Sequence, residues 1–95
     1  MQILWSPQSL RDLRAIREYI AKDSEHYAGL TIARIFAAVE RLLRFPHSGR
    51  VVPERNESAI REIIVGRLRV VYRVREATIE VATVFRASRQ FPEKF

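Results

Sequence analysis

The sequence predicts a single α+β domain in which an α-helical hairpin packs on a small antiparallel β-sheet. Two stretches in the N-terminal half repeat apolar residues at helical spacing, and three runs in the C-terminal half alternate with the period of a strand. The chain has 95 residues, which is too short for two domains, and 47% of them are hydrophobic, which is enough for one core. We therefore expect one domain over residues 1–95 with the element order β-α-α-β-β-β.

The N-terminal part is expected to form a short strand over residues 2–5 and a helix over residues 7–22. Ser6 and Pro7 are typical of a helix start, because Ser caps the first amides and Pro fits the first helical position. Apolar residues then recur on one helical face, and the charged residues between them are expected to face water. The apolar set is Leu10, Leu13, Ile16 and Ile20 with Tyr19 beside them, and the charged set is Arg11, Asp12, Arg14, Arg17 and Glu18.

A second helix is expected to begin after a cap at Asp23 or Ser24 and to end before Pro46 and Gly49. The short link predicts an αα-hairpin, and because neither helix can bury its stripe alone, both must pack on the sheet. The stripe consists of Ile32, Ile35, Phe36, Val39, Leu42 and Leu43, of which Ile35, Phe36, Val39 and Leu42 are expected to face Val70, Tyr72 and Val81.

Residues 46–59 carry turn formers and are expected to form a loop. Three strands should follow at 60–65, 68–74 and 78–85, with a tight hairpin at Gly66-Arg67 between the first two. Their alternation predicts an antiparallel meander with one apolar face under the helices and one more polar face. Tyr72 is expected in the core with Leu68, Val70 and Val74, and the other face is expected to display Arg69, Arg73 and Arg75 in a row.

The chain is strongly basic, with a net charge of +6, and only two of its 17 cations are Lys, which leaves 15 Arg. Arg makes planar, two-pronged contacts with phosphate and carboxylate groups, so the composition indicates a nucleic acid or an acidic protein partner. A high genomic GC content is an alternative source of the preference for Arg over Lys. It does not account for the net charge.

Several classes of protein are not expected. Cysteine is absent, so neither a disulfide nor a thiolate metal site is predicted. No apolar run approaches 18 residues, and residues 1–14 lack the pattern of a signal peptide, so we expect a cytoplasmic protein without a membrane segment. His26 and His47 are interpreted as solvated loop residues, and no phosphate-binding or dinucleotide-binding glycine pattern occurs. Neither a metal nor a cofactor is predicted.

Four segments, taken in this order, resemble the ParE/RelE superfamily of toxins from type II toxin–antitoxin systems over nearly the full chain. They are WSPQSLRDLRAIREYI (5–20), FPHSGR (45–50), REI (61–63) and LRVVYRV (68–74), and the FPHSGR loop and the hairpin resemble the ParE branch. The ParE resemblance implies a toxin that traps DNA gyrase on cleaved DNA. The RelE branch would instead imply a ribosome-dependent mRNA endonuclease.

The residues that the RelE branch uses for cleavage are incomplete here. Arg69 matches the strand arginine of that branch, but Glu62 stands near the position of its Lys and Ala87 at its second Arg. Phe91 lies where a Tyr is expected, and a phenyl ring cannot exchange a proton. We therefore predict no catalytic residues. Arg86 stands where ParE toxins commonly have His, so the contacts with the target are expected to differ.

The first reading is a ParE-like gyrase inhibitor that is neutralised by a ParD-like antitoxin with an acidic C-terminal segment, in a hetero-oligomer. The alternatives are an mRNA endonuclease acting on the ribosome and a degenerate, non-toxic binding module. Arg61 is expected either to pair with Glu62 across strands or to contribute to binding. The predicted target-binding residues are Arg61, Arg69, Arg73, Arg86, Arg89 and Phe91, with Arg69 and Arg73 pointing outward. The predicted antitoxin-binding residues are Leu13, Arg17, Ile20, Arg34 and Arg41.

Overall fold

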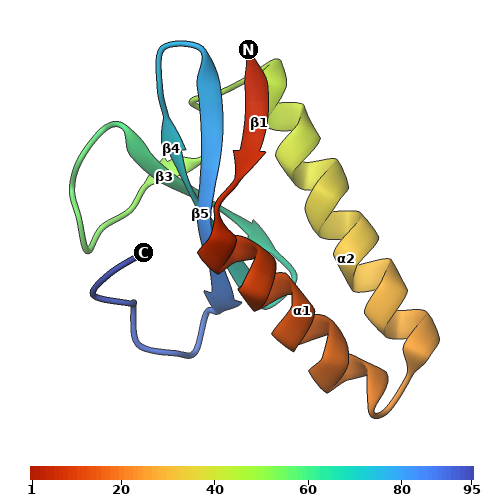
Figure 1. Cartoon of the computed structure of the whole chain (residues 1–95). Helices are drawn as coiled ribbons and strands as arrows, with labels where there is room; N and C mark the ends of the chain where they lie inside the picture. The colour runs from red at the N-terminus through yellow and green to blue at the C-terminus, as the bar shows by residue number, and fades with distance from the viewer.

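A computed structural model describes all 95 residues and places two helices on one face of a five-stranded sheet (Figure 1). The predicted α+β class and order of elements are confirmed, with one short extra strand inside the expected loop 46–59. The elements are β1 (Gln2–Trp5), α1 (Pro7–Ala21), α2 (Glu25–Glu40), the 3-10 helix η1 (Arg41–Leu43), β2 (Arg50–Val51), β3 (Ile60–Val65), β4 (Leu68–Val74) and β5 (Thr78–Arg86).

The sheet has the strand order β1-β5-β4-β3-β2. Strands β3, β4 and β5 form the predicted antiparallel meander, and Gly66 turns the first hairpin with a φ of 60°, in the left-handed region that favours glycine. Strand β1 pairs with β5 in parallel, so the sheet is mixed rather than wholly antiparallel. Parallel pairing needs a long crossover connection, and the helical hairpin is part of that connection.

Both helices begin where the capping residues predict. The Ser6 hydroxyl accepts a hydrogen bond from the amide of Ser9 at 3.0 Å, and the Ser24 hydroxyl accepts one from the amide of Tyr27 at 3.0 Å. Ser24, and not Asp23, is therefore the cap of α2. The caps satisfy amides that have no partner inside the helix.

The main core lies between the helices and the sheet. Ile35, Val39 and Leu42 of the second helical segment are buried there as predicted. They join the sheet residues expected opposite them, and Tyr72 is fully buried. The core residues are Leu13, Ile35, Val39, Leu42, Leu68, Val70, Tyr72, Ile79, Val81 and Val84.

The prediction that Phe36 faces the sheet is wrong. Phe36 is 42% exposed and packs the edge of its ring against Trp5, with the ring centroids 4.8 Å apart. It follows Ile35 by one residue, which is a rotation of about 100° around the helix, so it cannot share the face of Ile35 and Val39. Leu10 and Leu43, also assigned to the apolar stripes, are 50% and 40% exposed.

Asp12 does not face water as predicted, because its carboxylate caps the edge of β5 beyond the end of β1. One oxygen accepts hydrogen bonds from the Thr83 hydroxyl at 2.6 Å and the Val84 amide at 2.9 Å. The Ser6 hydroxyl donates to the carbonyl of Ala82 at 2.8 Å, next to an irregularity in the β4–β5 register. Side chains at the start of α1 thus satisfy strand groups that β1 is too short to reach.

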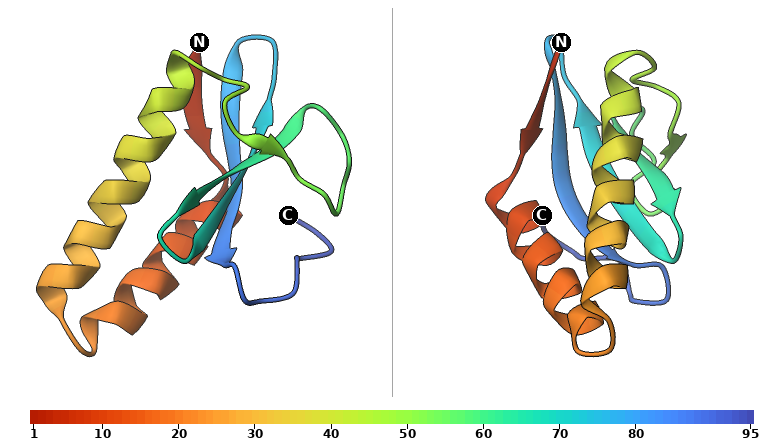
Figure 2. Two further views of the ribbon diagram at one scale, coloured as in Figure 1. Left: turned by 180° about the vertical axis from the view of Figure 1, so that it is seen from behind. Right: turned by 90° about the vertical axis from the view of Figure 1, so that its right-hand side faces the viewer.

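The second face of the sheet is covered rather than open. The segment after β5, residues 87–95, crosses this face on the side away from the helices (Figures 1 and 2). Together with the loop before β3 it closes a second apolar cluster, named here the tail cluster. Its members are Val52, Ile60, Val71 and Phe85, with Phe91 and Phe95 packed against them.

Candidate functional site

A groove of about 1280 Å³ runs between the helical hairpin, the β3–β4 turn and the end of β5. Its apolar lining comes from α1, from the strands and from two tyrosines that are about half exposed, Tyr19 and Tyr27. An apolar groove beside a helical hairpin is a common place for a partner's helix or peptide to bind. The apolar and aromatic lining residues are Ala15, Ile16, Tyr19, Ile20, Tyr27, Val65, Leu68, Val84, Phe85 and Ala87.

The groove is electropositive. It is lined by Arg34, Arg67, Arg86 and Arg89, none of which forms an ion pair. Its only acidic lining residue is Asp12, and one oxygen of that carboxylate already accepts the two hydrogen bonds from β5. Four unpaired guanidinium groups beside an apolar floor therefore favour a ligand that is both acidic and apolar.

The groove brings together residues from both predicted sets. Ile20 and Arg34 were expected to contact an antitoxin, and Arg86 and Arg89 a target. Arg86 also stacks on Tyr19, with its guanidinium carbon 4.3 Å from the ring centroid. Sequence reasoning missed Arg67, although it could have been found. Arg67 lies in the two-residue turn before β4, and the first residue of β4, Leu68, pairs with Arg86 at the end of β5.

Three residues of the predicted antitoxin set lie elsewhere. Leu13 is buried in the main core, so its side chain is not available for a partner. Arg17 is exposed and pairs with Glu25 at 3.4 Å. Arg41 lies beside a smaller hollow next to Gly49, away from the groove.

The prediction that Arg69 points outward into solvent is wrong. Its side chain is only 8% exposed and lies between the rings of Phe85 and Phe91, at 5.3 and 5.1 Å from their centroids. Its Nε donates to Glu62, and its two Nη atoms donate to the two oxygens of Glu54 at 3.1 and 2.9 Å. The residue is on the predicted face, but the tail cluster closes over it.

Glu62 is the buried centre of an ion cluster that the sequence did not reveal. Its side chain is fully buried and accepts hydrogen bonds from Arg69 on one oxygen and from Arg50 on the other. The chain of charges Arg50–Glu62–Arg69–Glu54 sums to zero. The hydrogen bonds between Arg69 and Glu54 lower the pKa of Glu54 and raise that of Arg69.

The row of arginines predicted on this face is largely neutralised. Arg73 and Arg75 both donate to Glu80, at 3.3 and 3.4 Å, and Arg73 also stacks on Phe95 at 4.7 Å. Arg61 does not pair with Glu62, since it donates to backbone carbonyls, including that of Gly49 at 2.9 Å. The second face is therefore not the cationic surface that the alternation predicted.

The FPHSGR loop is held by one buried hydroxyl. The Tyr72 hydroxyl accepts from the Gly49 amide at 3.0 Å and donates to the Pro46 carbonyl at 2.9 Å. A Cβ at Gly49 would lie 2.5 Å from the Glu62 carbonyl oxygen, so only glycine fits there. This loop positions Arg50 against the buried Glu62.

Replacing Tyr72 with Phe is expected to destabilise the protein by about 1–3 kcal/mol, because the buried Gly49 amide loses its partner. Burial raises the pKa of Tyr72. A raised pKa in the folded state means that this contribution to stability is present below the ordinary tyrosine pKa and is lost as the pH rises through the folded value. Urea unfolding at neutral and alkaline pH should therefore show a difference between wild type and Tyr72→Phe that shrinks at high pH. A constant difference would contradict this account.

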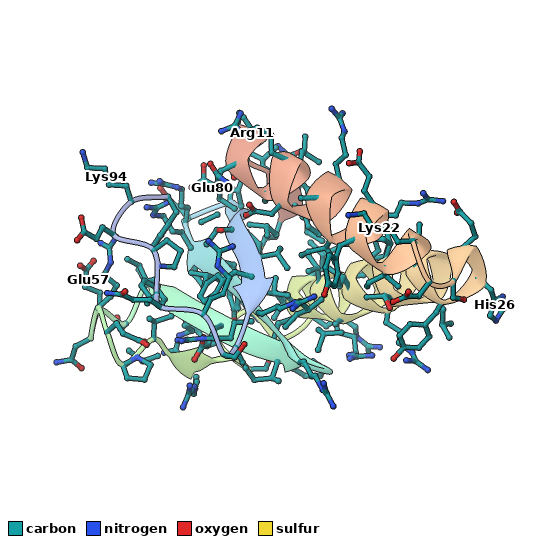
Figure 3. The ribbon with its side chains drawn as sticks, turned by 90° about the horizontal axis from the view of Figure 1, so that it is seen from below. Arg11, Lys22, His26, Glu57, Glu80 and Lys94 are labelled. Atoms are coloured by element: carbon teal, nitrogen blue, oxygen red, sulfur yellow. The ribbon has the colours of Figure 1, made fainter.

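The structure shows no assembly of three or more His, Asp or Glu side chains that could hold a metal ion. His26 lies at the tip of the helical hairpin, far from the sheet (Figure 3), and His47 lies in the FPHSGR loop. No helix has both the length and the apolar character needed to cross a membrane. Two residues compared above with the cleavage residues of the RelE branch are enclosed. Glu62 is bonded to Arg50 and Arg69, and Phe91 packs against the tail cluster.

Comparison with known proteins agrees with the fold and places the chain in a family. Residues 3–91 match the family described as "ParE toxin of type II toxin-antitoxin system, parDE", so the chain belongs to the ParE toxin family. It is 36% identical over 94 residues to "Putative toxin Y4kP" of Sinorhizobium fredii, covering 97% of this chain and 94% of that protein. It is 29% identical over 89 residues to "Toxin RelE2" of Caulobacter vibrioides, covering 93% and 97%.

A solved structure has the same fold. The structure described as "Chromosomal ParDE TA system from P. aeruginosa" superposes with a TM-score of 0.75 at 20% sequence identity, over 90% of this chain and 95% of that one. At this level of identity the likeness concerns the fold.

Proposed function

We propose that this ParE-family toxin acts in the cytoplasm by binding DNA gyrase and trapping it on cleaved DNA, and that an antitoxin silences it by occupying the groove. The groove carries the proposal for the antitoxin, because its apolar floor and four unpaired arginines fit an acidic, amphipathic segment. Membership in the ParE family supports the toxin role. The shared fold with a protein of a ParDE toxin–antitoxin system supports a hetero-complex with an antitoxin.

The physical basis of silencing is folding of the antitoxin segment on binding. A disordered segment loses chain entropy when it becomes ordered, so it must bury apolar surface and form charged hydrogen bonds in return. Ile16, Ile20 and the half-exposed Tyr27 offer apolar surface in the groove, while Arg34 and Arg86 offer planar forks to carboxylates. The same surface cannot then contact another macromolecule.

Action on gyrase by binding, rather than by cleavage of RNA, is supported by the state of the nuclease positions. Arg69 has all its guanidinium nitrogens engaged by two carboxylates. Glu62 stands near the position of the Lys that the RelE branch uses, and Phe91 packs inward where a proton acceptor would be needed. Proton transfer and charge stabilisation both lack their groups.

Induction of the gene in cells should produce filaments and a DNA-damage response, and purified protein should accumulate cleaved DNA–gyrase complexes. The variant Arg86→Glu should lower the yield of cleaved complexes. It should not lower the melting temperature, because Arg86 is exposed. Cleavage of mRNA at the ribosomal A site that disappears in Arg86→Glu would instead establish the endonuclease alternative. Normal growth on induction of a folded protein would establish a non-toxic binding module.

Reversing two groove charges, with Arg34→Glu and Arg86→Glu together, should weaken binding of the cognate antitoxin by at least about tenfold. The matched control is Arg11→Glu with Arg14→Glu, which makes the same change in net charge on exposed residues of α1 outside the groove. Titration calorimetry at low and high salt should show that the groove variant loses most of the salt dependence. Equal losses in the two variants would show that net charge, and not the groove, determines affinity.

A further inference from the structure

We propose that residues 87–95 form a latch that lifts from the second face of the sheet independently of global unfolding, and that its opening exposes Arg69. This segment forms the wall of the groove at Ala87, Ser88 and Arg89 and then crosses to the other face, where Phe91 and Phe95 join the tail cluster.

The latch is held almost entirely by side chains. From residue 90 onward no backbone group forms a hydrogen bond with another backbone group, and the last such bonds of the segment come from the amides of Ala87 and Arg89. The segment contains neither helix nor strand. A segment without backbone pairing can leave its site without breaking the sheet.

Two phenylalanines fix the latch through aromatic and cationic contacts. Phe91 meets Phe85 at 5.6 Å and Phe95 at 5.8 Å between centroids, in both cases edge to face. Arg69 stacks on Phe91, while Arg55 and Arg73 stack on Phe95 at 4.6 and 4.7 Å. Arg55 and Arg73 also donate hydrogen bonds to the carbonyls of Glu93 and Phe95, at 3.1 and 3.4 Å. Each of these contacts contributes modestly, so the closed state rests on a small set of side-chain interactions.

The latch covers an arginine, Arg69, that is bonded to two carboxylates. Arg69 is the arginine that links the buried Glu62 to Glu54, and Glu54 lies on a loop with its side chain 41% exposed. When the latch opens, an incoming carboxylate or phosphate could replace Glu54 on the guanidinium while Glu62 keeps its bonds to Arg50 and Arg69. The open state thus uncovers an arginine already aligned for an acidic group.

The chain has no cysteine, so a single introduced thiol is a clean probe of opening. Val71 and Val70 are neighbours on β4, both fully buried, and they point to opposite faces: Val71 into the tail cluster and Val70 into the main core. Val71→Cys should react with a thiol reagent under native conditions at least about tenfold faster than Val70→Cys, after correction for the stability of each variant measured in urea. Only global unfolding exposes Val70.

Adding Phe91→Ala should speed the labelling of Val71→Cys further and leave the labelling of Val70→Cys unchanged after the same correction. If Val71→Cys fails to fold, Ile60→Cys reports on the same cluster, since Ile60 is 5% exposed. Equal rates at the two faces, or no response to Phe91→Ala, would overturn the proposal, because the second face would then open only with the whole domain. The measurement needs neither antitoxin nor gyrase, so its outcome is separate from that of the proposed function.

Discussion

Replacing Glu62 with Ala is expected to destabilise the protein by about 3–5 kcal/mol, a large part of the roughly 5–15 kcal/mol typical of a small domain. Glu62 is fully buried and bonded to Arg50 and Arg69. Arg50 is 61% exposed and can turn to water, but Arg69 is held at 8% exposure under the tail cluster. The variant therefore leaves a charge in the interior with only one of its two carboxylates.

The matched variant is Glu54→Ala, which removes the other carboxylate of Arg69. Glu54 is 41% exposed, so water screens its interaction and the loss should be about 1 kcal/mol or less. Urea unfolding of both variants, with melting temperatures as a second readout, checks the difference. Similar losses for the two would mean that the cluster acts as one exposed ion-pair network and that burial of Glu62 is not decisive.

The lowered pKa of Glu54 gives the same interaction a pH dependence. A carboxyl whose folded pKa is depressed contributes stability above its unfolded pKa and loses it as the pH falls through the folded value. Because Glu54 is partly exposed, this acid-induced loss should be small and should diminish with added salt. Glu54→Ala should remove it.

Replacing Ile35 with Ala is expected to destabilise the protein by about 2–5 kcal/mol, while Phe36→Ala should cost less than about 2 kcal/mol although it removes a larger side chain. Ile35 is fully buried in the main core, and Phe36 is 42% exposed against Trp5. Trp5 is the only tryptophan in the chain and its ring meets that of Phe36, so its fluorescence should respond more to Phe36→Ala than to folded Ile35→Ala. A larger loss of stability in Phe36→Ala would show that α2 is rotated about its axis, with Phe36 toward the sheet.

Local patterns in the sequence were sufficient for most of the fold. Ser6 with Pro7 predicted the start of α1, the pair Asp23 and Ser24 predicted that of α2 to within one residue, and the alternation around Tyr72 predicted the strand that lies at the centre of the sheet. The exceptions were the short strand β2, the parallel pairing of β1 and the register of α2. Ile35 and Phe36 are both apolar and adjacent, and periodicity alone could not decide how far the apolar stripe extends around the helix.

The site was harder to predict because it depends on contacts between distant segments. Arg69 lies on the face that its alternation predicts, but Phe91 and Phe95, more than twenty residues later, cover that face. The carboxyl of Asp12 meets Thr83 at a separation of 71 residues, and no local pattern reports such a pairing. The groove combines α1, α2, a turn and the end of β5, so only the assembled fold brings Arg34, Arg67 and Arg86 together.

The parallel pairing of β1 with β5 has a consequence for how the toxin is made. Gln2 pairs with Thr78 and Trp5 with Val81, so the first strand of this domain to be translated must wait for the last strand, β5. Such long-range pairing slows folding, and until it forms the helical hairpin has no sheet to cover. During synthesis the growing chain therefore has neither a finished groove nor a finished second face, and the working surface forms only after residues 78–86 have been translated. An antitoxin already present in the cell would have that interval in which to be in place before its toxin becomes active.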